Sequence, residues 1–414
     1  MRNVAFIISL FALFSCVQKK VEISEWRGPN RSGIYNETNL LKEWPEDGPK
    51  LIWSNEEIGN GYGSPVFTGD VFYITGETDS TAYLFKFKTD GSLLWKKPFG
   101  NEWVVNWSGS RSAPTVVGTD VYVLTGKGDL SCLDAVIGDK KWSLNILEKY
   151  SGINTRFGLA EAIYVDGDKI YCMPGGTEHN VVALNRHTGD LIWSSKALGE
   201  RPGYNSPQMI NLPERKILVT FSAYHLIGID AETGELLWSH EQTNTKPEER
   251  GPGIGDTHAN TILYENGFIY YVAGDGNGGV KLQLSEDGKS ISEVWINKDF
   301  NSYMGGIVKV GDKIFGDSAT KQLLNVADAN TGAITDSLKV GHGSVIAADN
   351  LLYFYSFGGK VRLIDYSNKL TQLSEMKITM GTKEHFAHPV IHRGVLYVRH
   401  GNALMAYDIK RKDV

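Results

Sequence analysis

The stretch Gly228-Ile229-Asp230-Ala231-Glu232-Thr233-Gly234-Glu235-Leu236-Leu237-Trp238 combines a strand end, a tight turn and a second strand that reaches a tryptophan. Asp230 can fold its carboxylate onto the backbone N–H groups that follow it, and Gly234 can adopt a positive φ without a Cβ clash. The stretch therefore predicts a β-hairpin whose turn is fixed by an aspartate and a glycine.

The same unit recurs along the chain. Residues 183–193 form a nearly identical copy, and the tryptophans of the series stand at positions 53, 95, 142, 193, 238 and 295. Two further copies, at residues 327–332 and 363–365, lack the tryptophan. A repeat of roughly 40–55 residues is the spacing of β-propeller blades.

Each repeat supplies four strands. An inner strand follows a small residue or proline, as at Ser64-Pro65-Val66, and the next strand alternates aromatic and β-branched residues, as in Val121-Tyr122-Val123-Leu124. Units start near residues 64, 112, 160, 205, 258, 304, 343 and 387. We therefore predict an all-β, eight-bladed β-propeller of four-stranded antiparallel blades over residues 50–414.

The two ends of the repeat region complement each other. Residues 50–53 resemble an outer strand with no blade before it, whereas residues 387–414 supply three strands only. We expect the N-terminal strand to complete the C-terminal blade, which would leave no open sheet edge.

The first residues are typical of a secretion signal. Residues 4–14 form an apolar run too short to span a bilayer, and Leu13-Phe14-Ser15-Cys16 resembles a lipobox. We predict a lipoprotein signal peptide at residues 1–16 with lipidation of Cys16, followed by a tether and irregular segment at residues 17–49. Because Phe14 is bulky for a lipobox, cleavage by ordinary signal peptidase is the alternative. Lys19-Lys20 is not an acidic export signal, which favours an outer-membrane anchor facing the periplasm.

Composition and cysteines narrow the function. The 48 acidic residues exceed the 42 basic ones, so we expect no nucleic-acid partner. Cys132 and Cys172 fall in predicted strands of neighbouring blades, either as buried apolar residues or as a disulfide. No cysteine spacing is typical of a metal site.

The Asp/Asn-x-x-Thr-Gly-x-Leu-x-Trp unit resembles the repeat of the PQQ-like (pyrrolo-quinoline quinone) β-propeller superfamily, which includes quinoprotein alcohol dehydrogenases and BamB-like lipoproteins of barrel assembly. The resemblance implies that each tryptophan packs on the next blade. The opening at Trp26 is also similar to PQQ-like lipoproteins. The dehydrogenases use adjacent cysteines, calcium and an aspartate base, and this chain has no adjacent cysteines. We therefore expect neither PQQ nor calcium as a cofactor.

Candidate ligand-binding residues lie in the loops that lead into the innermost strands. We name these loops the mouth loops, because they surround one mouth of the channel. The candidates are Trp107, Arg111, Arg156, Glu161, Tyr204, His258, Tyr303, His342 and His385. Arginines could hold a carboxylate or sulfate, aromatic rings could stack on a sugar or peptide, and a His/Tyr pair could move protons. The alternative is an ordinary hydrated channel mouth.

Two loops are candidates for partner contacts. Residues 239–257 form the longest polar loop, either a lid or partner contact or a tolerated surface loop. Residues 103–107 contain two tryptophans, which either contact a partner or plug the ring.

Three functions remain in order of preference. The first is a non-enzymatic binding or scaffolding lipoprotein of the bacterial envelope that holds a protein or glycan partner. The second is a lyase or hydrolase acting on acidic polysaccharide, in which Arg111 and Arg156 neutralise a uronate and His258 or Tyr303 moves protons. The third is a PQQ-dependent dehydrogenase.

Overall fold

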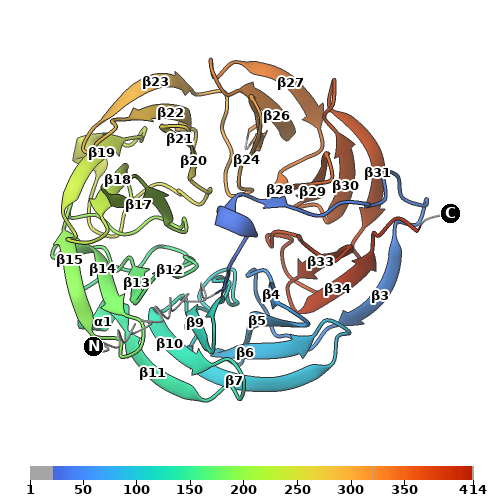
Figure 1. The fold of residues 1–414 in the computed structure, drawn as a ribbon, viewed down its shortest axis with the longest axis horizontal. Coiled ribbons are helices and arrows are strands. Elements are labelled where there is room, and N and C mark those ends of the chain that lie inside the picture. The colour runs from blue at the N-terminus through green and yellow to red at the C-terminus, as the bar shows by residue number, and fades with distance from the viewer. Residues whose placement is uncertain (1–21, 319, 413–414) are drawn as a thin grey trace, which may run out of the picture.

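The computed structural model describes residues 22–318 and 320–412, so the signal peptide and Cys16 lie outside the described residues. The described chain forms eight sheets, each built on a blade of four antiparallel strands, arranged around a central channel (Figure 1). The prediction of an eight-bladed, all-β propeller is confirmed.

The first four blades follow each other along the chain. Blade 1 comprises β4 (Val66–Thr68), β5 (Val71–Thr78), β6 (Thr81–Lys88) and β7 (Leu93–Asn101); blade 2, β8 (Thr115–Val117), β9 (Asp120–Leu124), β10 (Asp129–Asp134) and β11 (Lys140–Asn145), followed by helix α1 (Ile146–Lys149); blade 3, β12 (Tyr164–Asp166), β13 (Lys169–Cys172), β14 (His179–Asn185) and β15 (Leu191–Lys196); and blade 4, β16 (Gln208–Asn211), β17 (Lys216–Phe221), β18 (His225–Asp230) and β19 (Leu236–Glu241).

The remaining blades complete the ring. Helix η2 (Pro247–Glu249) precedes blade 5, which comprises β20 (Leu263–Glu265), β21 (Phe268–Ala273), β22 (Gly278–Leu284) and β23 (Ile291–Asn297); blade 6, β24 (Val308–Val310), β25 (Lys313–Ser318), β26 (Leu323–Asp328) and β27 (Ile334–Lys339); blade 7, β28 (Gly343–Ala348), β29 (Leu351–Ser356), β30 (Lys360–Asp365) and β31 (Thr371–Lys377); and blade 8, β32 (Val390–His392), β33 (Val395–His400), β34 (Ala403–Asp408) and β3 (Lys50–Asn55).

Strand β3 closes the ring as the sequence predicts. It pairs antiparallel with β34, which places Lys50 opposite Asp408 and Asn55 opposite Leu404. The chain ends are thereby joined in one sheet, so blade 8 has its outer strand from the N-terminal side of the sequence.

The repeated aspartate builds the turn between the third and fourth strands of a blade. The Asp230 carboxylate accepts hydrogen bonds from the backbone N–H groups of Glu232 (3.0 Å) and Thr233 (3.1 Å). Asp328 accepts from Asn330 and Thr331 in the same way. Because antiparallel strands alternate direction, these turns lie on the face of the ring opposite the mouth loops. We name this face the turn face.

The repeated tryptophan joins one blade to the next. The Trp238 indole N–H donates to the carbonyl of Gly288, in the corresponding turn of blade 5, at 3.2 Å. Trp193 donates likewise to Ala231 at 3.1 Å. The turn glycine lies against this ring, since a Cβ on Gly234 would be 2.6 Å from Trp193. The aspartate, glycine and tryptophan of the repeat are therefore one structural device.

Two blades replace the tryptophan with a different contact. In β27 the equivalent position is Asp336, whose carboxylate accepts from the backbone N–H of Leu370 at 2.6 Å. In β31 it is Ser374, whose hydroxyl accepts from the backbone N–H of Trp44 at 2.8 Å. Trp44 is buried and packs near Tyr353. Blade 7 thus lacks the repeat tryptophan, and Trp44 of the N-terminal segment contacts the residue at that position instead.

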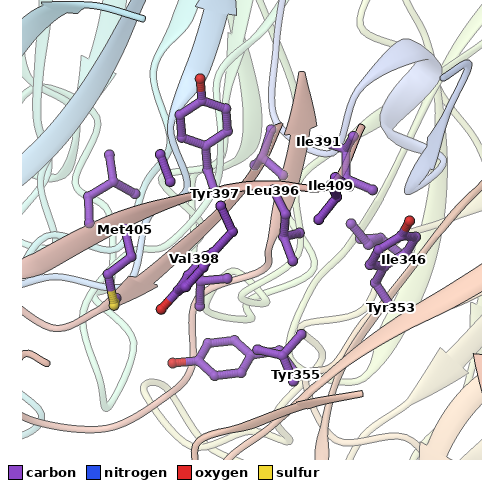
Figure 2. Packing of buried hydrophobic residues seen from close by; sticks show 14 of the residues in the cluster. Ile346, Tyr353, Tyr355, Ile391, Leu396, Tyr397, Val398, Met405 and Ile409 are labelled. Carbon is purple, nitrogen blue, oxygen red and sulfur yellow. The ribbon is translucent and has the colours of Figure 1, made fainter. Parts of the chain in front are cut away.

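Apolar side chains of neighbouring blades pack between the sheets. Figure 2 shows the cluster between blades 7 and 8, where Tyr353 and Ile346 face Ile391 and Leu396. Cys132 and Cys172 share another such cluster, between blades 2 and 3, and both are buried free thiols. The structure thus confirms that these cysteines serve as buried apolar residues.

Candidate functional site

A segment ahead of the propeller crosses the channel. Strand β1 (Ile23–Ser24) pairs with inner strand β8, helix η1 (Pro29–Arg31) lies at the centre of the ring, and β2 (Ile34–Tyr35) pairs parallel with inner strand β28 (Figure 1). We name residues 22–36 the plug. The sequence predicted only a tether and irregular segment over residues 17–49. In the structure, the plug adds a fifth strand to each of two blades.

Arg27 holds the plug to blades 6, 7 and 8. Its Nη2 donates to the Ile307 carbonyl at 2.8 Å, and its Nη1 lies 2.7 Å from His388 Nδ1 and 3.3 Å from the Val345 carbonyl. Because a guanidinium only donates, Nδ1 accepts, and the ring's proton resides on Nε2, which lies 3.3 Å from the Met304 carbonyl. Burial and the Arg27 charge lower the pKa of His388 well below its ordinary value. His388 is therefore neutral.

Arg31 holds the plug to blades 3 and 4. Its side chain is 1% exposed and donates to the carbonyls of Ala162 (3.1 Å), Ile163 (2.9 Å) and Pro207 (2.9 Å). Its Nε lies 2.6 Å from the Glu25 carboxylate. One buried side chain thus satisfies carbonyls of two blades, which fixes the plug across the channel.

A cavity of about 260 Å³ opens at the channel mouth that the mouth loops surround. Trp26 of the plug forms part of its wall, with its ring 5.1 Å from His388 in an edge-on arrangement. The mouth loops of seven blades supply the rest of the wall, which consists of Tyr62, Trp107, Arg111, Ala113, Phe157, Ala160, Ala162, Tyr204, Ser206, Thr257, Ala259, Tyr303, Met304, Phe386 and His388.

Aromatic rings dominate this wall. Trp107 meets Phe157 edge-on at 5.2 Å between ring centroids, Phe157 lies 5.8 Å from Tyr204, and Tyr62 lies 5.4 Å from Phe386. These spacings are those of favourable aromatic pairs, so the rings support one another. Trp107 is nevertheless 47% exposed, and it presents a large apolar surface at the mouth.

The loop that carries Trp107 and Arg111 is built around a buried acid. The Glu102 carboxylate accepts from the backbone N–H groups of Trp103 (2.8 Å) and Gly126 (2.7 Å) and from the Ser110 hydroxyl (2.7 Å). Burial raises the pKa of Glu102 in spite of these donors. The loop is therefore held by its own side chains and does not need the cavity to be filled.

Arg111 brings a positive charge to the apolar cavity. Its guanidinium donates to the carbonyls of Gly109 (2.8 Å), Asn106 (2.9 Å) and Trp107 (2.6 Å). Within residues 22–318 and 320–412, Arg111 forms no salt bridge. Burial lowers its pKa, and the attraction of Glu102 and Glu384, neither of which forms a salt bridge with it, opposes this shift only in part.

The structure brings four predicted residues together. Trp107, Arg111, Tyr204 and Tyr303 line the cavity. Arg156 is exposed beside Phe157 and does not line it. The side chain of His258 is fully buried against Phe221, 3.8 Å between ring centroids, although its neighbours Thr257 and Ala259 face the cavity. Adjacent residues of an extended loop point to opposite sides, which sequence position alone could not resolve.

The other three predicted residues lie away from the cavity. Glu161 is buried, accepts from the Met173 N–H at 3.0 Å, and has its pKa raised by burial to about 8. His342 stacks on Phe357. His385 bonds to the Tyr355 hydroxyl at 2.5 Å and stacks on His400, and burial followed by the nearby charges lowers its pKa to about 4.

The cavity wall contains one histidine, and Arg27 already occupies the Nδ1 of that ring. In the described part of the chain, no group of three or more His, Cys, Asp or Glu side chains is placed to hold a metal ion. Nor does a helix of the described residues have the length and apolarity needed to span a membrane.

Several wall residues were missed by sequence reasoning. Phe157 and Phe386 stand in mouth loops, and their aromatic character in an otherwise polar loop was an available signal. Trp26 comes from the plug, and no local pattern indicates that this segment enters the channel.

The fold and cavity define a closed propeller with a small binding cavity at one mouth, the form of a binding or scaffolding module. The sequence model of the family described as outer membrane protein assembly factor BamB matches residues 44–196 and 88–337, which together cover more than half of the chain. The chain belongs to this family. No curated protein matches it.

Solved structures agree on the fold. BamB from Moraxella catarrhalis superposes with a TM-score of 0.63 at 11% identity, over 88% of this chain and 99% of that one. Sqt1 from Saccharomyces cerevisiae gives 0.57 at 12%, over 90% and 100%. The quinohemoprotein alcohol dehydrogenase ADHIIG from Pseudomonas putida HK5 gives 0.50 at 12%, over 93% and 79%. At identities this low, the superpositions show a shared fold and say nothing about a shared chemistry.

Proposed function

We propose that this protein is a non-enzymatic binding module of the bacterial envelope that holds a protein partner over the cavity. Its family is described as an outer membrane assembly factor, which supports a scaffolding role. The single observation that carries the proposal is the aromatic cavity at one mouth of the channel. It joins a small apolar recess to a rigid rim, which is the usual form of an interface hot spot.

The rim of the cavity supports a protein partner. Val105 is 75% exposed and Val104 is 37% exposed in the loop that carries Trp107. Ile254 is 55% exposed in the mouth loop that leads into blade 5, which also supplies Thr257 to the cavity wall. Apolar side chains grouped around a recess favour a protein surface, since a glycan would pair better with polar groups at the rim.

The catalytic alternatives have less support. The proposed polysaccharide chemistry needs Arg111 and Arg156 together with His258 or Tyr303, but only Arg111 and Tyr303 line the cavity. A PQQ-dependent dehydrogenase has no support beyond the fold. The proposal therefore includes no cofactor, and PQQ with calcium should leave the melting temperature of the protein unchanged.

Photo-crosslinking from the cavity rim tests the proposal. A benzophenone amino acid at Val105 should crosslink a distinct protein in native envelopes. The matched control is Val136, which is 62% exposed in a blade 2 turn on the turn face. Equal adducts from the two positions, or none from Val105, would contradict the proposal. An oligosaccharide that binds should stabilise the folded protein by about 2.7 kcal/mol at 100 times its dissociation constant. A rise in melting temperature with an oligosaccharide would therefore favour a glycan partner instead.

Membrane attachment is a separate part of the proposal. We propose that Cys16 carries a lipid that anchors the protein to the outer membrane, facing the periplasm. Replacing this cysteine, Cys16→Ser, should move the protein from the membrane fraction to the soluble fraction. Recovery of the variant in the membrane fraction would argue against lipidation.

A further inference from the structure

The size of the cavity limits its occupant. Its volume of about 260 Å³ is below the roughly 300–1,000 Å³ of sites for drug-sized ligands. An extended oligomer or a large cofactor therefore cannot enter completely. A single ring system can, with the rest of the ligand left outside on the rim. This is how one buried side chain anchors a peptide or protein.

The wall favours an aromatic ring as that anchor. Tyr62, Phe157 and Phe386 surround the space, and Trp107 stands edge-on to Phe157 at its mouth. A ring inserted among them meets both faces and edges of other rings, and both arrangements are favourable. Flexible aliphatic chains would bury similar area but would lose more conformational freedom on entering.

Arg111 specifies the charge next to that ring. Its three hydrogen bonds go to carbonyls, and among the described residues no carboxylate forms a salt bridge with it, although Glu102 and Glu384 attract its charge without such contact. The bonds use both hydrogens of Nη2 and one of Nη1, which leaves the Nε–H and one Nη1–H as donors. An aromatic cage alone could take a cation, but a guanidinium in the wall repels one.

We propose that the cavity binds an acidic aromatic peptide segment, in which a Trp, Tyr or Phe ring enters the cavity and a neighbouring Asp or Glu carboxylate, or a chain-terminal carboxylate, bonds to Arg111. This inference rests on the proposed function and names the chemistry of the partner at that site. The exposed Val104, Val105 and Ile254 contact apolar residues that flank the ring. The carboxylate gives specificity, because it supplies the direct salt-bridge partner that Arg111 does not have among the described residues.

Selection from a random short-peptide display library tests the ligand chemistry. The wild-type protein should enrich sequences with an aromatic residue next to an acidic one. The variant Arg111→Gln should keep the aromatic preference and lose the acidic one. Arg156→Gln is the matched control, because Arg156 is exposed nearby and does not line the cavity. Ala259→Phe, which fills the cavity, should abolish the aromatic preference.

A synthetic peptide from the enriched set then separates the two contacts. Arg111→Gln should weaken its binding about tenfold, the effect of one charged hydrogen bond, and should not affect the same peptide with Asp or Glu replaced by its amide. Circular dichroism and melting of each variant check folding. If Arg111→Gln does not fold, Arg111→Lys, which keeps the charge without the planar donors, replaces it and should lose most of the acidic preference.

Each other outcome overturns the inference. No enrichment, basic or non-aromatic sequences, or an equal loss in Arg156→Gln would each show that the cavity does not read an acidic aromatic segment. The proposed function can survive that result. If Val105 crosslinks a partner while the display yields no such sequence, the protein is a binding module whose partner docks by other chemistry.

Discussion

Carboxylates in the repeated turns and two buried carboxylates of the mouth loops have pKa values shifted in opposite directions. On the turn face, Asp134 and Asp328 each accept backbone hydrogen bonds from their own turn, and these bonds lower the pKa of both. On the mouth-loop face, burial raises the pKa of Glu102 and, to about 8, that of Glu161. The same functional group is stabilised as an anion in these turns and destabilised at the two buried mouth-loop positions.

This difference indicates which face contains features that stability of the fold alone does not require. The turn face repeats one local solution, in which the turn aspartate accepts from backbone N–H groups two and three residues further on. The mouth-loop face places Glu161, Arg111 and His258 where desolvation opposes their charged forms. Departures from local consistency of this kind concentrate at functional sites. The comparison therefore adds support to the proposal that the mouth-loop face holds the partner.

The largest expected effect is a pH-dependent one, from Glu161→Gln. The pKa of Glu161 rises from its ordinary 4.5 to about 8 in the folded protein, so the folded state holds a proton there that the unfolded state has released. Wild-type stability should fall as pH rises from about 4.5 to 8. The variant should lack this fall, a gain of about 5 kcal/mol relative to wild type between pH 4 and pH 9, measured by urea unfolding.

Asp328→Asn on the turn face is the control with the opposite sign. The pKa of Asp328 is lowered, so its contribution to stability is present above its ordinary pKa of 3.8 and is lost as pH falls. The variant should therefore be less stable than wild type near neutral pH and approach it in acid. Parallel pH profiles for Glu161→Gln and wild type would break the comparison of the two faces.

The next largest effect should come from the turn face itself. Trp238→Ala removes a buried ring and its bond to Gly288, at a cost of about 3 to 4 kcal/mol. Asp336→Ala, at the equivalent position of blade 6, should cost only about 1 kcal/mol, because it removes one hydrogen bond to Leu370 and no ring. Denaturant midpoints measure both. Equal costs would show that the tryptophan joins blades by no more than a hydrogen bond.

A third prediction concerns the plug, which both faces share. Arg31→Ala leaves the carbonyls of Ala162, Ile163 and Pro207 without this donor, which should cost about 3 kcal/mol. Limited proteolysis should then cleave within residues 22–36 faster than in wild type. Unchanged stability and cleavage would mean that the strand pairings of β1 and β2 hold the plug without Arg31.

The turn face was predictable because its determinants are local. Asp230, Gly234 and Trp238 lie within one hairpin, and six tryptophans repeat the signal along the chain. The closing strand β3 was predictable by elimination, since an unpaired strand at one end met a three-stranded blade at the other. Repetition thus made both blade number and closure readable.

The mouth-loop face was predictable only in part, because its determinants are distant in sequence. The loop positions of Trp107, Arg111, Tyr204 and Tyr303 predicted residues that line the cavity, whereas His258 is buried away from it, because each loop residue can face either side. The plug could not be found at all, since the partners of Arg27 are more than 270 residues away. No hydrophobic period or turn motif encodes such contacts.

The smallest expected effect on stability is that of Trp107→Ala. Trp107 is 47% exposed and its loop is held by Glu102, so the free energy of unfolding should change by less than about 0.5 kcal/mol. Partner affinity should nevertheless fall about 30-fold or more, as for a central aromatic contact, measured by crosslinking yield from Val105. This separation of binding from stability is what distinguishes the two faces, because Trp238→Ala should change stability and leave the cavity rim in place. A Trp107→Ala protein that unfolds readily would show that this tryptophan closes the ring and serves no partner.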